Sequence, residues 1–152
     1  MTRTQARELA VRLVYTLAEN PADAKTTLEE TLDAEYYATL ADEDELYKLR
    51  PTGDALNYLE RVVTGVSEHL AELDSYIEKH AVGWQFYRIS RTAVSIMRVA
   101  MFEALYMPDI PRAAAMNEAI ELAKKYDTPE TVSFTNGVLG AFTKTEIPDA
   151  GK

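Results

Sequence analysis

The chain has 152 residues, enough for one domain with a real core or for two small helical bundles. Its net charge of -9 argues against a generic nucleic-acid binder whose affinity comes mainly from neutralised phosphates. It has no cysteine, which excludes disulfides, thiolate metal sites and thiol catalysis. Charges recur in the N-terminal segment and no apolar run reaches the roughly 18 residues of a membrane span, so we expect a cytoplasmic protein with no membrane contact.

Apolar residues recur at helical spacing almost everywhere, which predicts an all-α fold with about six or seven helices. The first helix carries one apolar stripe, because Leu9, Leu13 and Leu17 lie four residues apart. A second helix is expected from an N-cap at Thr26 or Thr27, with acids in its first turn that favour the helix dipole.

The charged segment DEDELYKLRPTGD, residues 42–54, contains a proline and a glycine and interrupts this pattern. We expect it to separate an N-terminal helical pair from the remaining helices, which share the core with that pair. One long helix is predicted next, from about Asp54 to His80, and a short helix at residues 83–90. A buried helix follows in RTAVSIMRVAMFEALYM, residues 91–107.

The last helix poses a problem of its own. Asn136-Gly137 between apolar residues is a strong signal for a β-hairpin. However, Thr128 and Pro129 form a helix start, and the following GAFTKTEIPDAGK is a poor strand. We therefore predict one helix that continues through Gly137.

No catalytic or metal chemistry is evident in the sequence. His69 and His80 are the two histidines, and they do not stand at metal-ligand spacing with each other. No pattern matches a phosphate loop or a nucleophile with its base. We therefore interpret the chain as a non-enzyme, and expect no metal and no cofactor.

Three blocks of the sequence carry a resemblance to known proteins. The first is RTQARELAVRLVY, at residues 3–15. The second combines Gly83-Trp84 with RISRTAVSIMRVAMFEALYMPDIP, which ends at residue 111. The third and most specific is NEAIELAKKYDTPETVSFTNGVLGAF, residues 117–142. Taken in order, these blocks resemble the NusB family of bacterial transcription antitermination factors.

The resemblance implies a NusB-like helical fold of two small three-helix bundles, forming one RNA-binding domain over residues 1–147. Residues 148–152 are expected to be a frayed tail. It also implies that the protein binds boxA-type single-stranded RNA of ribosomal RNA operon leaders, jointly with the small-subunit ribosomal protein NusE. This complex helps RNA polymerase read through termination signals. Some relatives self-associate, so a homodimer stays open.

Recognition of single-stranded RNA needs cations for phosphates, flat side chains for stacking and polar groups for base edges. The candidate RNA-binding residues, in chain order, are Arg3, Arg7, Arg12, Tyr15, Glu130, Phe134 and Asn136. Each also has a structural interpretation: Arg7 can pair with an acid on its own helix, Phe134 and Tyr15 can pack, and Asn136 can stabilise its own helix.

Gly137 in a helix interior costs roughly 1 kcal/mol relative to alanine. We expect the missing side chain to let the last helix approach the first closely, which would bring Phe134 beside Arg7. The arginines and the aromatic ring would then form one composite surface.

Some residues depart from the family pattern. Thr4 and Gln5 replace arginines that are common in the family, which predicts weaker phosphate binding. Ala93 and Val94 replace a usual acid and a usual base, which weakens the case for partner docking at that point. The alternative is a protein-protein adaptor of the same fold with weak or lost RNA binding. A third hypothesis is a regulatory fragment of an RNA-modifying enzyme.

Overall fold

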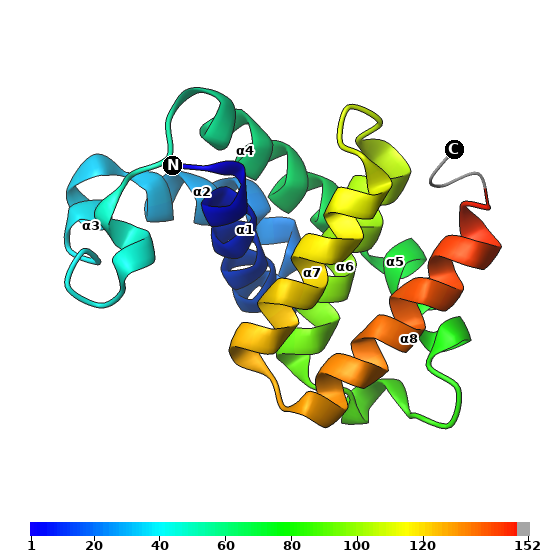
Figure 1. Ribbon diagram of the computed structural model, residues 1–152. Coiled ribbons are helices and arrows are strands. Elements are labelled where there is room, and N and C mark those ends of the chain that lie inside the picture. Colours follow the sequence, from blue (N-terminus) through cyan, green and yellow to red (C-terminus); the bar gives the residue numbers. More distant parts are fainter. Residues whose placement is uncertain (149–152) are drawn as a thin grey trace. The chain divides into compact units, whose positions relative to one another are not determined.

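A computed structural model describes residues 1–148, which form eight α-helices, three short 3₁₀ helices and no strand (Figure 1). The all-α prediction is therefore confirmed over this range. The expected six or seven helices became eight because two predicted helices are each interrupted. Most of the expected frayed tail lies outside the described residues. No helix in the described range is long and apolar enough to span a membrane.

The chain separates into two compact units, residues 1–68 and residues 69–152. We refer to them as the first unit and the second unit. The segment at residues 42–54 separates the first helices from α4 (Gly53–Glu68) in sequence, as expected, and lies inside the first unit, so the boundary between the units falls later, at residues 68–69. Whether residues 1–147 act as a single domain stays a prediction.

The first unit is built around two long helices, with shorter helices between them in sequence. In chain order its elements are α1 (Arg3–Leu17), η1 (Pro21–Asp23), α2 (Ala24–Leu32), α3 (Ala34–Ala38), η2 (Glu45–Lys48) and α4 (Gly53–Glu68). Helix α1 packs mainly on α4. The predicted stripe of Leu9, Leu13 and Leu17 is buried, as expected for its core-facing side.

A capping box fixes the start of α1. The Thr2 hydroxyl accepts a hydrogen bond from the backbone N–H of Gln5, at 3.1 Å. In return, the Gln5 side-chain oxygen accepts from the backbone N–H of Thr2, at 2.8 Å. Gln5 therefore has a structural role at the helix start.

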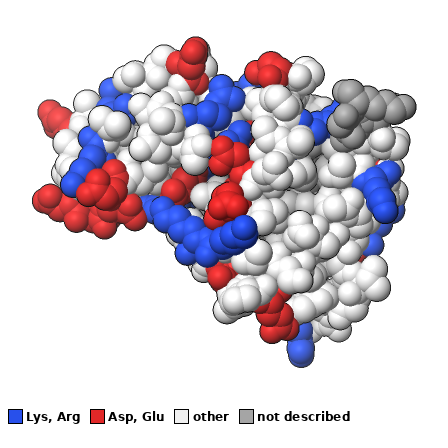
Figure 2. Space-filling view, viewed as in Figure 1, with Lys and Arg blue, Asp and Glu red and all other residues white. Residues whose placement is uncertain are grey.

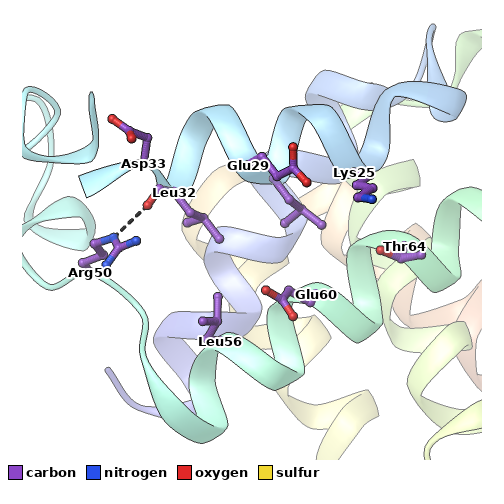
Figure 3. A pocket seen from close by; sticks show the side chains of 9 residues that line it. Lys25, Glu29, Leu32, Asp33, Arg50, Leu56, Glu60 and Thr64 are labelled. Carbon is purple, nitrogen blue, oxygen red and sulfur yellow. Dashed lines mark hydrogen bonds between the residues drawn. The ribbon is translucent and has the colours of Figure 1, made fainter. Parts of the chain in front are cut away.

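The second predicted helix begins earlier than expected and is interrupted. It starts at Ala24 instead of an N-cap at Thr26 or Thr27, and it stops at Leu32. Asp33 causes the interruption, because its carboxylate accepts from the backbone N–H of Tyr36 at 3.1 Å and so starts α3 as an N-cap. Arg50 satisfies the end of α2, since its Nε donates to the Leu32 carbonyl at 2.7 Å (Figure 3).

The second unit is built around a largely buried helix. Its elements are α5 (Leu70–His80), η3 (Phe86–Arg88), α6 (Arg91–Tyr106), α7 (Arg112–Tyr126) and α8 (Pro129–Glu146). Helices α5, α7 and α8 each pack on α6 (Figure 1). The predicted burial of this helix is confirmed, with Ile96, Met97 and Met101 at most 1% exposed.

The predicted long helix from Asp54 to His80 was wrong, because the backbone breaks at His69, where φ is -111° and ψ is 19°. His69 makes side-chain contacts at the break. Its ring stacks on Tyr106 with centroids 4.2 Å apart, and its Nδ1 lies 3.4 Å from a Glu72 carboxylate oxygen. The spacing of apolar residues did not indicate the break, since it is helical on both sides of His69.

Helix α8 runs without interruption through Asn136 and Gly137, which confirms the helical interpretation over the hairpin. It begins as expected, with the Thr128 hydroxyl accepting from the Thr131 N–H at 3.3 Å. Packing within the second unit does not require Gly137, since a Cβ atom built on this residue would meet nothing within 4 Å. The expected close approach of α8 to α1 stays a prediction.

Candidate nucleic-acid interface

Two of the predicted cations share one face of α1. Arg3 and Arg7 are four residues apart, and both guanidinium groups lie over the ring of Tyr58 on α4, at 4.5 Å and 5.6 Å from its centroid. Arg3 is exposed, whereas Arg7 is only 3% exposed. Arg3 is therefore held by the aromatic ring in a position where it can meet a phosphate. The buried Arg7 packs against Tyr58, and its contact with RNA stays a prediction.

The third cation is engaged inside the first unit. The Arg12 guanidinium lies 3.2 Å from the Glu8 carboxylate and 2.9 Å from that of Asp44, and 5.3 Å from the ring of Tyr47. The contacts with Asp44, the N-cap of η2, and with Tyr47 inside η2 tie α1 to this short helix. Two carboxylates already neutralise this charge, which lowers its value for binding a phosphate. Tyr15, further along the same helix, is 40% exposed.

The candidates on α8 are Glu130 in the first turn and Phe134 and Asn136 in the uncharged stretch that follows. Glu130 and Asn136 are exposed and Phe134 is half-buried, whereas Thr135 and Val138 face the core. Residues 131–143 contain no charged side chain. Figure 2 shows a broad uncharged area over this helix. RNA bases can approach such a surface without desolvating ionised groups.

Asn136 also lines a shallow groove between α7 and α8, with a volume of about 560 Å³. Its other lining residues are Ile120, Lys124, Asp127, Pro129, Val132 and Ser133. Burial raises the pKa of Asp127, and a hydrogen bond from the Ser90 hydroxyl at 3.3 Å opposes that rise only in part. The amide of Asn136 can donate to or accept from a base edge placed in this groove.

The sequence interpretation missed a second aromatic ring beside Phe134. Trp84 lies in the loop between α5 and α6, and its ring centroid is 4.7 Å from that of Phe134, with the planes tilted by 48°. The sequence predicted only a short helix at residues 83–90. A glycine followed by a tryptophan and three more large side chains was the available signal for an exposed turn.

The first unit has a different kind of groove, between α2 and α4, with a volume of about 440 Å³ (Figure 3). Leucine side chains line part of it, and its charged lining residues are Lys25, Glu29, Asp33, Arg50 and Glu60. None of the predicted RNA-binding residues lines it. Three carboxylates against two cations make it a poor site for a polyanion.

The structure therefore brings the predicted residues together as two groups. The first unit holds Arg3, Arg7, Arg12 and Tyr15, and the second unit holds Glu130, Phe134 and Asn136. A composite surface formed by both groups stays a prediction. Ala93 and Val94, at the doubtful partner contact, are at most 5% exposed.

Comparisons with known proteins agree with this architecture. The NusB family model matches residues 4–144. The NusB transcription antitermination protein of Ruminiclostridium cellulolyticum is 36% identical over 97% of this chain and 92% of its own length. That of Thermoanaerobacter sp. strain X514 is 33% identical over 100% of this chain and 97% of its own length.

Solved structures give the same result. T. maritima NusB has a TM-score of 0.69 at 26% identity, covering 95% of this chain and 92% of that one. A chain in the crystal structure of a plectonemic RNA supercoil has a TM-score of 0.73 at 24% identity, covering 97% of this chain and 98% of that one, which supports the fold.

The fold and its relatives define a class of all-helical, non-enzymatic transcription factors. Within this class, the chain belongs to the NusB family of transcription antitermination proteins, since the family model covers nearly its whole length.

Proposed function

We propose that this protein binds boxA-type single-stranded RNA of ribosomal RNA operon leaders together with NusE. It would work in the cytoplasm as a non-catalytic part of the antitermination complex on RNA polymerase. The main support is α8, where FTNGVL, part of the block most similar to the family, coincides with an accessible helix face that includes Phe134 and Asn136. A ring, an amide and an uncharged surface are the groups that single-stranded RNA recognition uses.

The cations on α1 supply the second part of the proposal. Arg3 is exposed and held over Tyr58, so its guanidinium loses less freedom when it binds a phosphate. We propose that the α1 group and the α8 group contact the same RNA strand. Because α1 offers few accessible cations, its own contribution to phosphate binding is small. Tight binding of RNA therefore depends on NusE in this proposal.

A second candidate is a protein-protein adaptor of the same fold with weak or lost RNA binding. The observation that favours it is the state of the α1 arginines. Arg7 is buried and Arg12 is paired with two carboxylates, so phosphate binding by this helix depends mainly on Arg3.

One experiment separates the two candidates. Binding of boxA-type and scrambled RNA is measured by fluorescence anisotropy, with and without NusE, over a salt series. The proposal predicts selective binding of boxA-type RNA that is strongest with NusE and weakens with salt. The adaptor hypothesis predicts binding to NusE and no selectivity between the two RNAs at any salt concentration.

A further inference from the structure

The loop between α5 and α6 displays large apolar side chains to solvent. Val82 is 86% exposed, Trp84 45% and Tyr87 76%. Together with Phe134 of α8, which contacts Trp84, we call these residues the aromatic patch. Exposed apolar side chains that gather in one loop mark an interaction site more often than isolated ones do.

The loop is held in place at both ends. Ala81 and Ile89 flank it and are buried, at 3% and 7% exposure. The Trp84 N–H donates to the Ala81 carbonyl at 3.1 Å, closing a turn. Gly83 has a φ of +83°, a backbone conformation that favours glycine. The side chains of the patch are therefore displayed by a defined turn.

A partly buried ion pair lies next to the same loop. Arg98 of α6 forms two hydrogen bonds with the Asp74 carboxylate, at 2.8 Å and 2.9 Å. Its guanidinium also lies 6.0 Å from the ring of Phe86 in η3. The two hydrogen bonds to Asp74 hold the Arg98 guanidinium in one orientation. Phe86 packs near this fixed group.

The charge around the patch indicates which ligand it suits. Residues 81–102 contain three arginines and no acid, and residues 131–143 of α8 contain no charge. The guanidinium of Arg88, in the loop itself, lies 5.9 Å from the Tyr87 ring. Exposed Glu130 of α8 stands one helical turn from Phe134, so a basic protein would meet one carboxylate here. An RNA strand would meet rings for its bases and the exposed guanidinium of Arg88 for a phosphate.

We propose that the aromatic patch is a stacking platform for the bases of single-stranded RNA, with Trp84 as its central ring. This inference rests on the proposed function, and it adds a contact that the α1 and α8 groups do not include. Trp84 contacts Phe134 with ring planes tilted by 48° and stays 45% exposed, so part of the indole is accessible to an unstacked base. Arg88 lies in the same loop to meet the adjoining phosphate.

Trp84 is the sole tryptophan of the chain, which provides a direct readout. Binding of boxA-type RNA in the presence of NusE is followed by anisotropy of labelled RNA and, in parallel, by tryptophan emission. The Trp84→Phe variant has no tryptophan, so it measures the background emission of the other components of the complex. We expect the RNA to quench the emission of the native protein, because a stacked base lies against the indole.

Affinity supplies the second readout. Trp84→Leu keeps apolar bulk against Phe134 but cannot stack, so we expect boxA affinity to fall by roughly fivefold to 100-fold, the range of one base stack. Trp84→Phe keeps a ring and should stay within about threefold of the native protein. Tyr36→Ala removes an aromatic of similar exposure from α3 and should change nothing.

Each outcome decides the proposal. Selective RNA binding with unquenched emission and an unaffected Trp84→Leu variant overturns the platform but leaves the proposed function standing. Loss of NusE binding by Trp84→Leu, with RNA affinity of the protein alone unchanged, identifies a protein-docking patch and also overturns it. Absence of boxA selectivity in the native protein overturns both the platform and the proposed function.

Discussion

The two units of this chain divide its charge very unevenly. Residues 19–45 of the first unit contain ten acids and one lysine, a net charge of -9, which equals that of the whole chain. The remaining residues contain fifteen charges of each sign. The second unit instead presents an acid-free loop with exposed rings and an uncharged face of α8. The overall charge is therefore a poor guide to the nucleic-acid affinity of any one surface.

The difference also shows how an acidic protein can be selective for RNA. The acids of the first unit repel a generic polyanion, whereas the uncharged and aromatic surface of the second unit can bind bases by stacking. A surface that depends on stacking is less sensitive to salt than one that depends on cations.

The largest expected effect concerns the partly buried Arg98–Asp74 ion pair beside the aromatic patch. The Arg98 side chain is 7% exposed and that of Asp74 is 23% exposed, so Asp74→Asn leaves a largely buried guanidinium without its charge partner. We expect the free energy of unfolding to fall by about 3 kcal/mol, measured by urea titration followed by circular dichroism. The matched control is Glu121→Gln, which breaks an exposed pair with Lys124 and should cost less than about 0.5 kcal/mol. Equal effects of the two variants would contradict this account.

Removal of the α8 ring is the next largest effect. We expect Phe134→Ala to weaken binding of boxA-type RNA in the presence of NusE by roughly fivefold to 100-fold, because a stacking face is lost. Phe134→Tyr keeps the ring and should bind nearly as well as the native protein. Anisotropy titrations measure both, with melting temperatures confirming that each variant is folded. An Ala variant that binds like the native protein would mean that the ring serves packing only.

The arginines of α1 allow a finer comparison within the first unit. Arg3→Gln should weaken RNA binding severalfold and lower the slope of log affinity against log salt by about 0.7, the value for one phosphate on a single strand. Arg12→Gln should have a smaller effect on the slope, because Glu8 and Asp44 already neutralise that charge. A salt series from 50 mM upward, set up as for the native protein, measures both slopes. A larger effect from Arg12→Gln would reverse the roles assigned here.

The smallest expected effect comes from the acidic segment. A triple variant, Glu30→Gln, Glu35→Gln and Glu43→Gln, removes three exposed carboxylates. We expect about a twofold gain in affinity for scrambled RNA at low salt, little change for boxA-type RNA, and no difference at 1 M salt, where screening acts within about 3 Å. Filter-binding assays with the two RNAs at both salt concentrations test this. A loss of boxA affinity would show that these acids contact the complex directly.

Much of the fold was predictable because helical periodicity and capping residues are local signals. The stripe of Leu9 and Leu13, the helix start at Thr128 and the helix through Gly137 all follow from residues within a few positions of one another. The helix start at Asp33 was also predictable, since aspartate is a common N-cap. Its carboxylate accepts a hydrogen bond from the backbone N–H three residues later. The break at His69 was not predictable, because the ring on which His69 stacks belongs to Tyr106, 37 positions away in the chain.

The candidate site was less predictable than the fold. Sequence spacing put Arg3 and Arg7 on one face of a helix, but it could not show that Tyr58 lies beneath them or that Arg7 is buried. The exposure of Trp84 was also not predictable, because large apolar residues are usually buried. Contacts between elements that are distant in sequence decide both cases.

Crosslinking of bound RNA to the protein tests the central claim most directly. The complex of the native protein, NusE and boxA-type RNA with photoreactive bases is irradiated, and the crosslinked peptides are identified by mass spectrometry. This account predicts crosslinks in α1 near Arg3, in α8 near Phe134 and in the loop at Trp84. Crosslinks confined to one unit, or located in residues 19–45, would contradict the claim that both units read one RNA strand.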